Sequence, residues 1–196
     1  MKKIEIIWRE LLYQAIEKGN RQFTQKGLAK EFNFSTSTVF QALKAPRKMG
    51  AVRVTGRFFV LENPEKLLYH WASVRNLKKD VIFTARVELP ILEIEGRMPP
   101  TVVFGGYSSA RQKLSAPPAD YDKVYIYSQN LEEIKERFNL QKGRENLIVL
   151  KPDKFLTDYG QTTTLAQTFV DLWNLSDWYA KEFTGALKKK IDELLP

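Results

Sequence analysis

The chain has 196 residues, of which 43% are hydrophobic and 28% are charged, with a formal charge of +8 at pH 7 and no cysteine. This length and composition suit one or two soluble globular domains and argue against a disordered or fibrous protein. Without cysteine, the chain can form no disulfide, thiolate metal site or cysteine nucleophile.

The first residues begin like a secretory signal peptide, but Glu5, Arg9 and Glu10 interrupt the apolar run. Apolar residues recur here at helical spacing, which predicts an amphipathic helix over 4–18 that ends at Gly19-Asn20. No other segment resembles a transmembrane span. We therefore expect a cytoplasmic protein without a membrane partner.

Two further helices are predicted in quick succession. A short extended piece at 22–24 leads into a helix over 25–32, and Asn33-Phe34 then turn the chain. Ser35 is a good N-cap for the next helix, because its hydroxyl can accept the amide two or three residues on. Ala29 supplies the small residue that a helix-turn-helix needs where its two helices cross.

A hairpin follows these helices. Residues 51–55 and 58–61 alternate as short strands, and Gly56-Arg57 supply a tight turn between them. Helix, helix, turn, helix and hairpin in this order predict a winged helix over residues 1–78.

In a winged helix the third helix enters the DNA major groove. Val39, Leu43 and Met49 are expected to hold it to the core, which leaves its polar side chains facing outward. Hydroxyls at its start suit phosphates, and Gln41 suits a bidentate contact with an adenine edge. The predicted DNA-binding residues are Ser35, Thr36, Ser37, Gln41, Lys44, Arg47, Lys48, Arg53 and Arg57.

Two positions leave alternatives open. Pro46 falls where a core leucine is usual, so the helix is expected to bend or break near Lys44 and restart. Phe40 can pack against a thymine methyl or be buried, and we favour burial.

The distribution of charge agrees with a basic DNA-binding part. Residues 1–80 hold 16 Lys/Arg and 7 Asp/Glu, a net charge of +9, whereas residues 81–196 hold 15 and 16, a net charge of −1. Such asymmetry is typical of a polyanion-binding module joined to a neutral domain.

A helix over 64–75 is predicted to bridge into a second domain over 79–196, in which strands and helices alternate as in an α+β fold. The aromatic residues Trp173, Trp178 and Tyr179 are predicted to be core. The predicted strands are 81–88, 101–104, 123–127 and 146–150. The predicted helices are 89–96, 107–114, 130–138, 163–174 and 177–192.

Gly105-Gly106 and, further on, Asp120 and Asp122 suggest an alternative function. Nucleotidyltransferases carry a glycine pair and an acidic pair that holds Mg²⁺, with a third carboxylate for which Asp153 is the nearest candidate. A glycine turn and a polar loop explain the same residues without catalysis. His70 is the only histidine and is expected to be structural. We expect no enzyme activity, catalytic residue, metal or cofactor.

The C-terminal half contains the segments TVVFGGYSSARQ, DKVYIYS and TTLAQTFVDLWNL in this order. Through Gly105 to Ala110, Val124 to Tyr127 and Thr164 to Leu172 it resembles the AbiEi-type antitoxins of type IV toxin–antitoxin systems, which also begin with a winged helix. Gln167 and Asp171 fall in the third of these.

The resemblance implies a transcriptional repressor that binds double-stranded DNA at inverted repeats in its own promoter. It further implies a C-terminal domain that antagonises a nucleotidyltransferase toxin. A third interpretation makes the winged helix a protein-interaction module, for which the basic hairpin would be dispensable. The oligomeric state is not encoded in any of these patterns.

Overall fold

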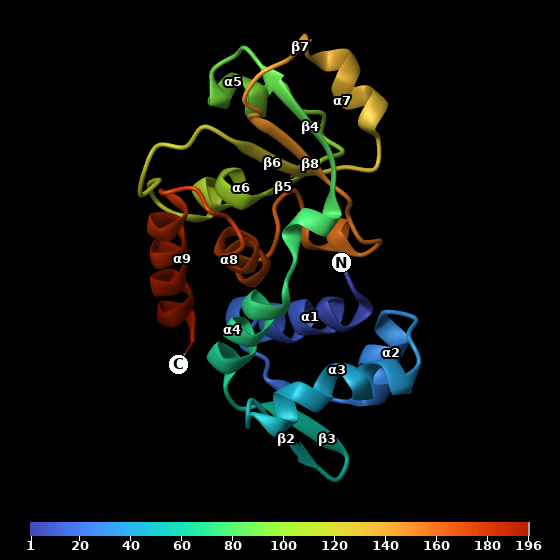
Figure 1. The fold of residues 1–196 in the computed structure, drawn as a ribbon. Coiled ribbons are helices and arrows are strands. Elements are labelled where there is room, and N and C mark those ends of the chain that lie inside the picture. The colour runs from blue at the N-terminus through green and yellow to red at the C-terminus, as the bar shows by residue number, and fades with distance from the viewer. Residues whose placement is uncertain (196) are drawn as a thin grey trace.

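The computed structural model describes residues 1–195 and shows an α+β protein with helices and two separate sheets (Figure 1). The N-terminal part, at the lower end of the view, packs helices around a small sheet of order β1-β3-β2. Its elements are α1 (Lys3–Glu17), β1 (Gln22–Phe23), α2 (Gln25–Glu31), α3 (Thr36–Lys48), β2 (Val52–Thr55), β3 (Phe58–Leu61) and α4 (Pro64–Val74).

The C-terminal part is built on a five-stranded sheet of order β5-β6-β8-β4-β7. Strands β6 and β8 are parallel, and the other neighbouring pairs are antiparallel. The elements are η1 (Leu77–Asp80), β4 (Val81–Val87), α5 (Ile91–Gly96), β5 (Val103–Gly105), α6 (Gly106–Lys113), β6 (Val124–Tyr127), α7 (Leu131–Arg137), β7 (Leu140–Gln141), β8 (Leu147–Leu150), η2 (Leu156–Tyr159), α8 (Leu165–Trp173) and α9 (Ala180–Leu194).

Both faces of β6 and β8 are buried, so these two strands are apolar throughout rather than alternating. Val124 and Ile126 of β6 lie in a core with Ile134 of α7. Tyr125 and Tyr127 point to the opposite face and join the core that contains α6, α8 and α9. Figure 1 shows α5 and α7 above the sheet and α6, α8 and α9 below it.

The lower core is continuous with the core of the N-terminal part, so α1 and α4 pack directly against α8. Arg75, at the end of α4, is buried in this contact and donates to Asp171 of α8 at 3.0 Å and to Asp80 at 2.6 Å. Burial lowers the pKa of Arg75, but the neighbouring Asp171, Tyr127 and Asp80 outweigh it and raise the pKa overall. The predicted boundary after residue 78 falls within η1.

Gly106 explains the glycine pair between β5 and α6. Its φ is +48°, and a Cβ added there would meet the ring and Cβ of Tyr125 at 3.0 to 3.1 Å. A side chain at this position would therefore be strained and crowded, which gives the glycine a structural reason.

Several predictions about the C-terminal part were wrong. Trp173 and Trp178 are 51% and 78% exposed, so they are not core residues, whereas Tyr179 is buried as predicted. The last helix begins at Ala180 rather than at 177, and β5 covers Val103–Gly105 rather than 101–104. The short elements β7, η1 and η2 were not predicted at all, because two to four residues carry no periodic signal.

Candidate nucleic-acid interface

Helix α3 is fixed at its start and along one side. The hydroxyl of Ser35 accepts a hydrogen bond from the amide N–H of Thr38 at 3.1 Å and also contacts the Thr38 hydroxyl at 3.0 Å. Ser35 is therefore the N-cap of α3, as predicted. Two residues before Ser35, Asn33 has φ +50°, a left-handed conformation that asparagine tolerates better than most residues. The buried side of α3 consists of Val39, Ala42, Leu43 and Pro46.

The predicted break near Lys44 does not occur, because α3 runs without interruption from Thr36 to Lys48 and contains Pro46. Proline removes the amide that would donate to the carbonyl of Ala42. The indole Nε1 of Trp8, on α1, donates to that carbonyl at 2.7 Å instead. The side chain of Pro46 is buried and contributes to the core contact of the helix.

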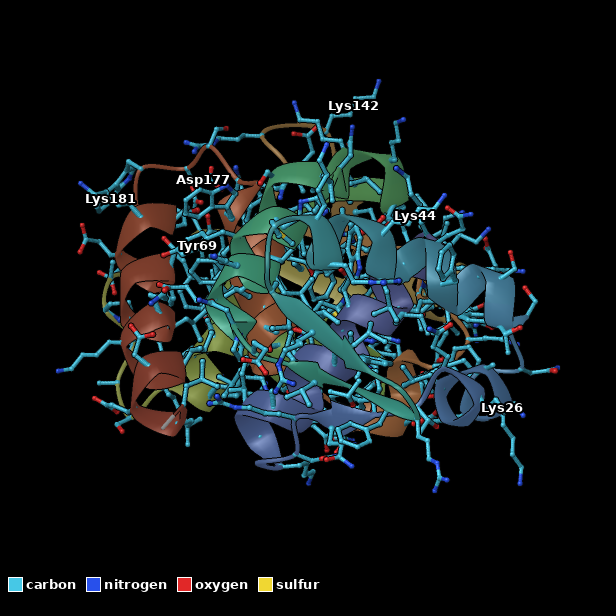
Figure 2. The ribbon with its side chains drawn as sticks, turned by 90° about the horizontal axis from the view of Figure 1, so that it is seen from below. Lys26, Lys44, Tyr69, Lys142, Asp177 and Lys181 are labelled. Atoms are coloured by element: carbon cyan, nitrogen blue, oxygen red, sulfur yellow. The ribbon has the colours of Figure 1, made fainter. Side chains whose placement is uncertain are left out.

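All nine predicted DNA-binding side chains are exposed to solvent. Helix α3 and the hairpin β2–β3 lie at the end of the molecule far from the five-stranded sheet (Figure 1). Seen from below in Figure 2, Lys44 of α3 and Lys26 of α2 point away from the body of the molecule. Those on or next to α3 are Ser35, Thr36, Ser37, Gln41, Lys44, Arg47 and Lys48, and those on the hairpin are Arg53 and Arg57.

Phe40 lies on the exposed side of α3, so the expectation that it is buried was wrong. It is 40% exposed, and the cationic groups of Lys44 and Arg47 lie 5.7 and 6.0 Å from its ring centroid. Contacts of this kind stabilise a cation over an aromatic face. An aromatic ring therefore stands among cations in the middle of the polar face of α3.

The hairpin presents its two arginines differently. Arg53, on β2, forms an exposed ion pair with Glu62 at 2.7 Å, so it already has a partner within the chain. Thr55 pairs with Phe58, which leaves Gly56 and Arg57 as a two-residue turn. Within the described residues Arg57 has no ion pair, and its side chain is exposed.

Residues 32–61 contain five Lys/Arg and no Asp or Glu, so α3 and the hairpin form a surface of one sign. Charge of one sign on an exposed face attracts polyanions and accelerates their association. Glu62 follows directly after this segment and pairs with Arg53, so it offsets the charge of one of these five cations.

Lys26 belongs to the same surface and was missed by the sequence analysis. It lines a groove of about 340 Å³ between the start of α2 and the hairpin, together with Thr24 and Arg57. A lysine two residues after the capping threonine of a short helix was the available signal.

The C-terminal part supports the turn between α2 and α3. Phe155, in the loop after β8, packs edge-on against Phe32 at 4.9 Å and Phe34 at 5.9 Å between ring centroids. Two residues earlier, Asp153 accepts both terminal nitrogens of the buried Arg9 of α1, at 2.7 and 2.8 Å. Nothing in the local sequence pattern around Asp153 indicated this contact.

The three carboxylates considered for a magnesium site do not come together. Asp153 is bound by Arg9, whereas Asp122 is exposed, accepts from the hydroxyl of Tyr179 and lies 3.3 Å from Arg144. Among residues 1–195 no group of three or more His, Asp or Glu side chains is placed to share a cation. His70 packs edge-on against Trp8 at 5.0 Å, which is a structural contact.

Comparison of the chain with protein-family models, with curated protein sequences and with solved structures found no match in any of the three. Within the described part of the chain, every helix is too short or too polar to cross a membrane.

Proposed function

We propose that residues 1–78 form a winged helix that binds double-stranded DNA, and that the protein is a transcriptional regulator. The observation that carries this proposal is the exposed face of α3, which presents hydroxyls, Gln41 and three cations beside an arginine-tipped hairpin. The absence of acidic residues from 32–61 supports the same conclusion, because the phosphate backbone dominates DNA affinity.

In this proposal α3 lies in the major groove. Ser35, Thr36 and Ser37 contact phosphates near its start, and Gln41 reads a base edge. Lys44, Arg47 and Lys48 neutralise backbone charge toward its far end. Arg57 reaches the neighbouring backbone or minor groove from the hairpin tip, and Arg53 joins it by exchanging Glu62 for a phosphate.

We further propose that the regulator acts as an antitoxin of the AbiEi type. Its support is the resemblance carried by Gly105 to Ala110, Val124 to Tyr127 and Thr164 to Leu172. It would repress its own operon at inverted repeats and antagonise a nucleotidyltransferase toxin. A nucleotidyltransferase gene beside this one, whose product is toxic only without this protein, would be the expected genetic arrangement. Survival of cells with the toxin alone would contradict it.

DNA binding is tested by fluorescence anisotropy with a labelled duplex between about 50 and 200 mM salt, the range over which phosphate contacts change affinity strongly. We expect Arg53→Ala and Arg57→Ala to weaken binding to all duplexes and each to reduce the slope of log K against log salt by about 1. Arg97→Ala is the matched control, because Arg97 is an exposed arginine on α5's side of the C-terminal sheet.

The proposal would be contradicted if Arg53→Ala and Arg57→Ala had the same DNA affinity and the same salt slope as the natural chain and the Arg97→Ala control. Absence of binding to any duplex in a random-sequence library at 50 mM salt would do so as well. If the DNA binding of the hairpin variants equals that of the natural chain and the variants still bind a protein partner, the interaction-module interpretation replaces the DNA-binding proposal.

A further inference from the structure

A cleft of about 340 Å³ opens at the carboxyl-terminal ends of β6 and β8 in the five-stranded sheet. Its residues are far along the chain from the proposed DNA-binding residues. Two segments form most of the cleft, and each directly follows a strand. One follows β6 and the other follows β8, the only parallel neighbours among the described strands. The lining residues are Thr101, Val103, Tyr127, Ser128, Gln129, Asn130, Pro152, Asp153, Lys154 and Thr157.

The path of the chain creates this cleft. After β6 the chain turns to α7, whose Ile134 packs on one face of the sheet. After β8 it turns to α8, whose Phe169 packs on the opposite face. Where the connections from adjacent parallel strands leave toward opposite faces, a crevice forms at their carboxyl ends, and α/β proteins bind ligands there.

The polar groups of the cleft favour an anion. Asp153 brings the one carboxylate of the lining, and both its oxygens are occupied by the guanidinium of Arg9. Lys154 has no ion pair within the described residues, and its ammonium makes only ring contacts with Phe34 and Phe155. The side chains of Gln129 and Thr157 have no hydrogen-bond partner in residues 1–195. The ammonium of Lys154, the amide of Gln129 and the hydroxyl of Thr157 thus keep their polar bonding capacity for a ligand, and Lys154 reaches it by leaving the rings of Phe34 and Phe155.

Side-chain contacts also link the cleft to α3, the helix that is proposed to enter the major groove. Phe155 follows Lys154 and packs on Phe32 and Phe34, which flank the turn into α3. Asp153 holds Arg9 of α1, and α1 in turn packs against α3. A ligand that draws Lys154 into the cleft would therefore act on residues that contact the turn before α3.

We propose that this cleft binds a small metabolite through a phosphate or carboxylate group, held by Lys154 with Gln129 and Thr157. A volume of about 340 Å³ lies at the lower end of the range for small-molecule sites. Occupancy changes the DNA affinity of α3 through Phe155, and this second statement rests on the proposed function.

The site is tested by ¹H–¹⁵N correlation spectra of the full chain during titration with inorganic phosphate and, separately, with citrate. We expect saturable shifts in residues 127–130 and 152–157 with at least one probe, and the probe that acts identifies the group. Lys154→Gln should weaken binding about tenfold or more, because a charge-assisted contact is lost. Lys151→Gln is the control, since Lys151 is exposed nearby but does not line the cleft.

No saturable shift with either probe would overturn the binding site, and so would shifts that persist unchanged in Lys154→Gln. The regulatory statement is tested by anisotropy with a DNA duplex with and without the active probe. Unchanged DNA affinity would overturn the coupling and leave the cleft as a ligand site. A protein that binds the probe but no DNA would contradict the proposed function alone.

Discussion

The indole Nε1 of Trp8 donates to the carbonyl oxygen of Ala42 at 2.7 Å, in a buried contact between α1 and α3. Ala42 is the residue whose carbonyl lacks a helical partner, because Pro46 stands four residues later without an N–H. An unpaired buried carbonyl would cost about 1 to 3 kcal/mol. The tryptophan therefore compensates for the proline, and α3 continues past Pro46 to Lys48.

This relationship predicts a non-additive effect of two substitutions. Trp8→Phe removes the donor and should lower the free energy of unfolding, while Pro46→Ala supplies an amide that can pair with Ala42. Trp8→Phe should therefore cost about 1 kcal/mol less in the Pro46→Ala background. Denaturant unfolding of the four proteins measures this coupling, and the loss of ring volume cancels because both backgrounds contain it.

The four proteins form a double-mutant cycle, and additivity of the two changes would contradict the proposed compensation. If the two changes add to within about 0.5 kcal/mol, the tryptophan contributes packing only and the compensation is wrong.

The contact between Arg9 and Asp153 is expected to contribute strongly to holding the two parts of the molecule together. Arg9 is fully buried, and burial lowers its pKa, but the carboxylate of Asp153 outweighs this and raises the pKa overall, so Arg9 stays charged. Asp153→Asn would leave that charge without its ion pair. We expect a loss of about 3 to 5 kcal/mol in the free energy of unfolding.

The exposed pair of Lys135 and Glu132 provides the matched control. Glu132→Gln should change the stability by at most about 1 kcal/mol, because solvent screens the pair. Similar small losses for both variants would show that Arg9 finds another acceptor when Asp153 is removed.

Local spacing was sufficient to predict the N-terminal elements and the outward side of α3. Caps, helical periodicity and a two-residue turn act over a few neighbouring residues, so they can be read directly from the sequence. The burial of Phe40 was mispredicted because Val39, Ala42 and Leu43 already fill the buried side of the helix. Trp173 was mispredicted because apolar character alone does not say which side of α8 is covered, and Trp178 was mispredicted because it lies in the turn before α9 rather than in the helix.

The features that depend on distant residues could not be predicted. The partner of Ala42 lies 34 residues away, and Arg9 and Asp153 are 144 residues apart. The cleft after β6 and β8 requires the strand order and the faces to which α7 and α8 return. None of these follows from periodicity, because strand order and side-chain partners are set by tertiary packing.

His70 is expected to make the stability depend on mildly acidic pH. Burial lowers the pKa of His70, so the folded state favours the neutral ring that packs on Trp8. The unfolded chain takes up this proton near pH about 6.5. Stability due to the neutral ring is therefore complete above that pH and is lost as the pH falls toward the lower pKa of the folded state.

Denaturant unfolding between pH 7.5 and 5.5 measures this effect. As the pH is lowered, the free energy of unfolding should decrease in the natural chain and decrease less in His70→Gln. His70 is the only histidine, so no other imidazole contributes. Carboxylates contribute equally to both proteins, so the difference between them isolates His70. Parallel curves for the two proteins would contradict the expected role.

Gln41 and Phe40 lie next to each other on the exposed side of α3, and they should read different groups of the DNA. Gln41→Ala should relax the preference at one base step by about 1 to 3 kcal/mol, because a bidentate contact with adenine is lost. In the proposed complex Phe40 offers an apolar ring, and its expected partner in the major groove is the thymine methyl.

Replacing single thymines by deoxyuridine in the selected duplex removes only that methyl group. We expect one such replacement to weaken binding by the natural chain and to have no further effect on Phe40→Ala. Phe40→Ala should lower the free energy of unfolding by only about 1 kcal/mol, because the ring is 40% exposed and its ring contacts are with the exposed Lys44 and Arg47. If no deoxyuridine position distinguishes the two proteins, Phe40 serves to hold Lys44 and Arg47 in place, and Phe40→Ala should then lower affinity for every sequence equally.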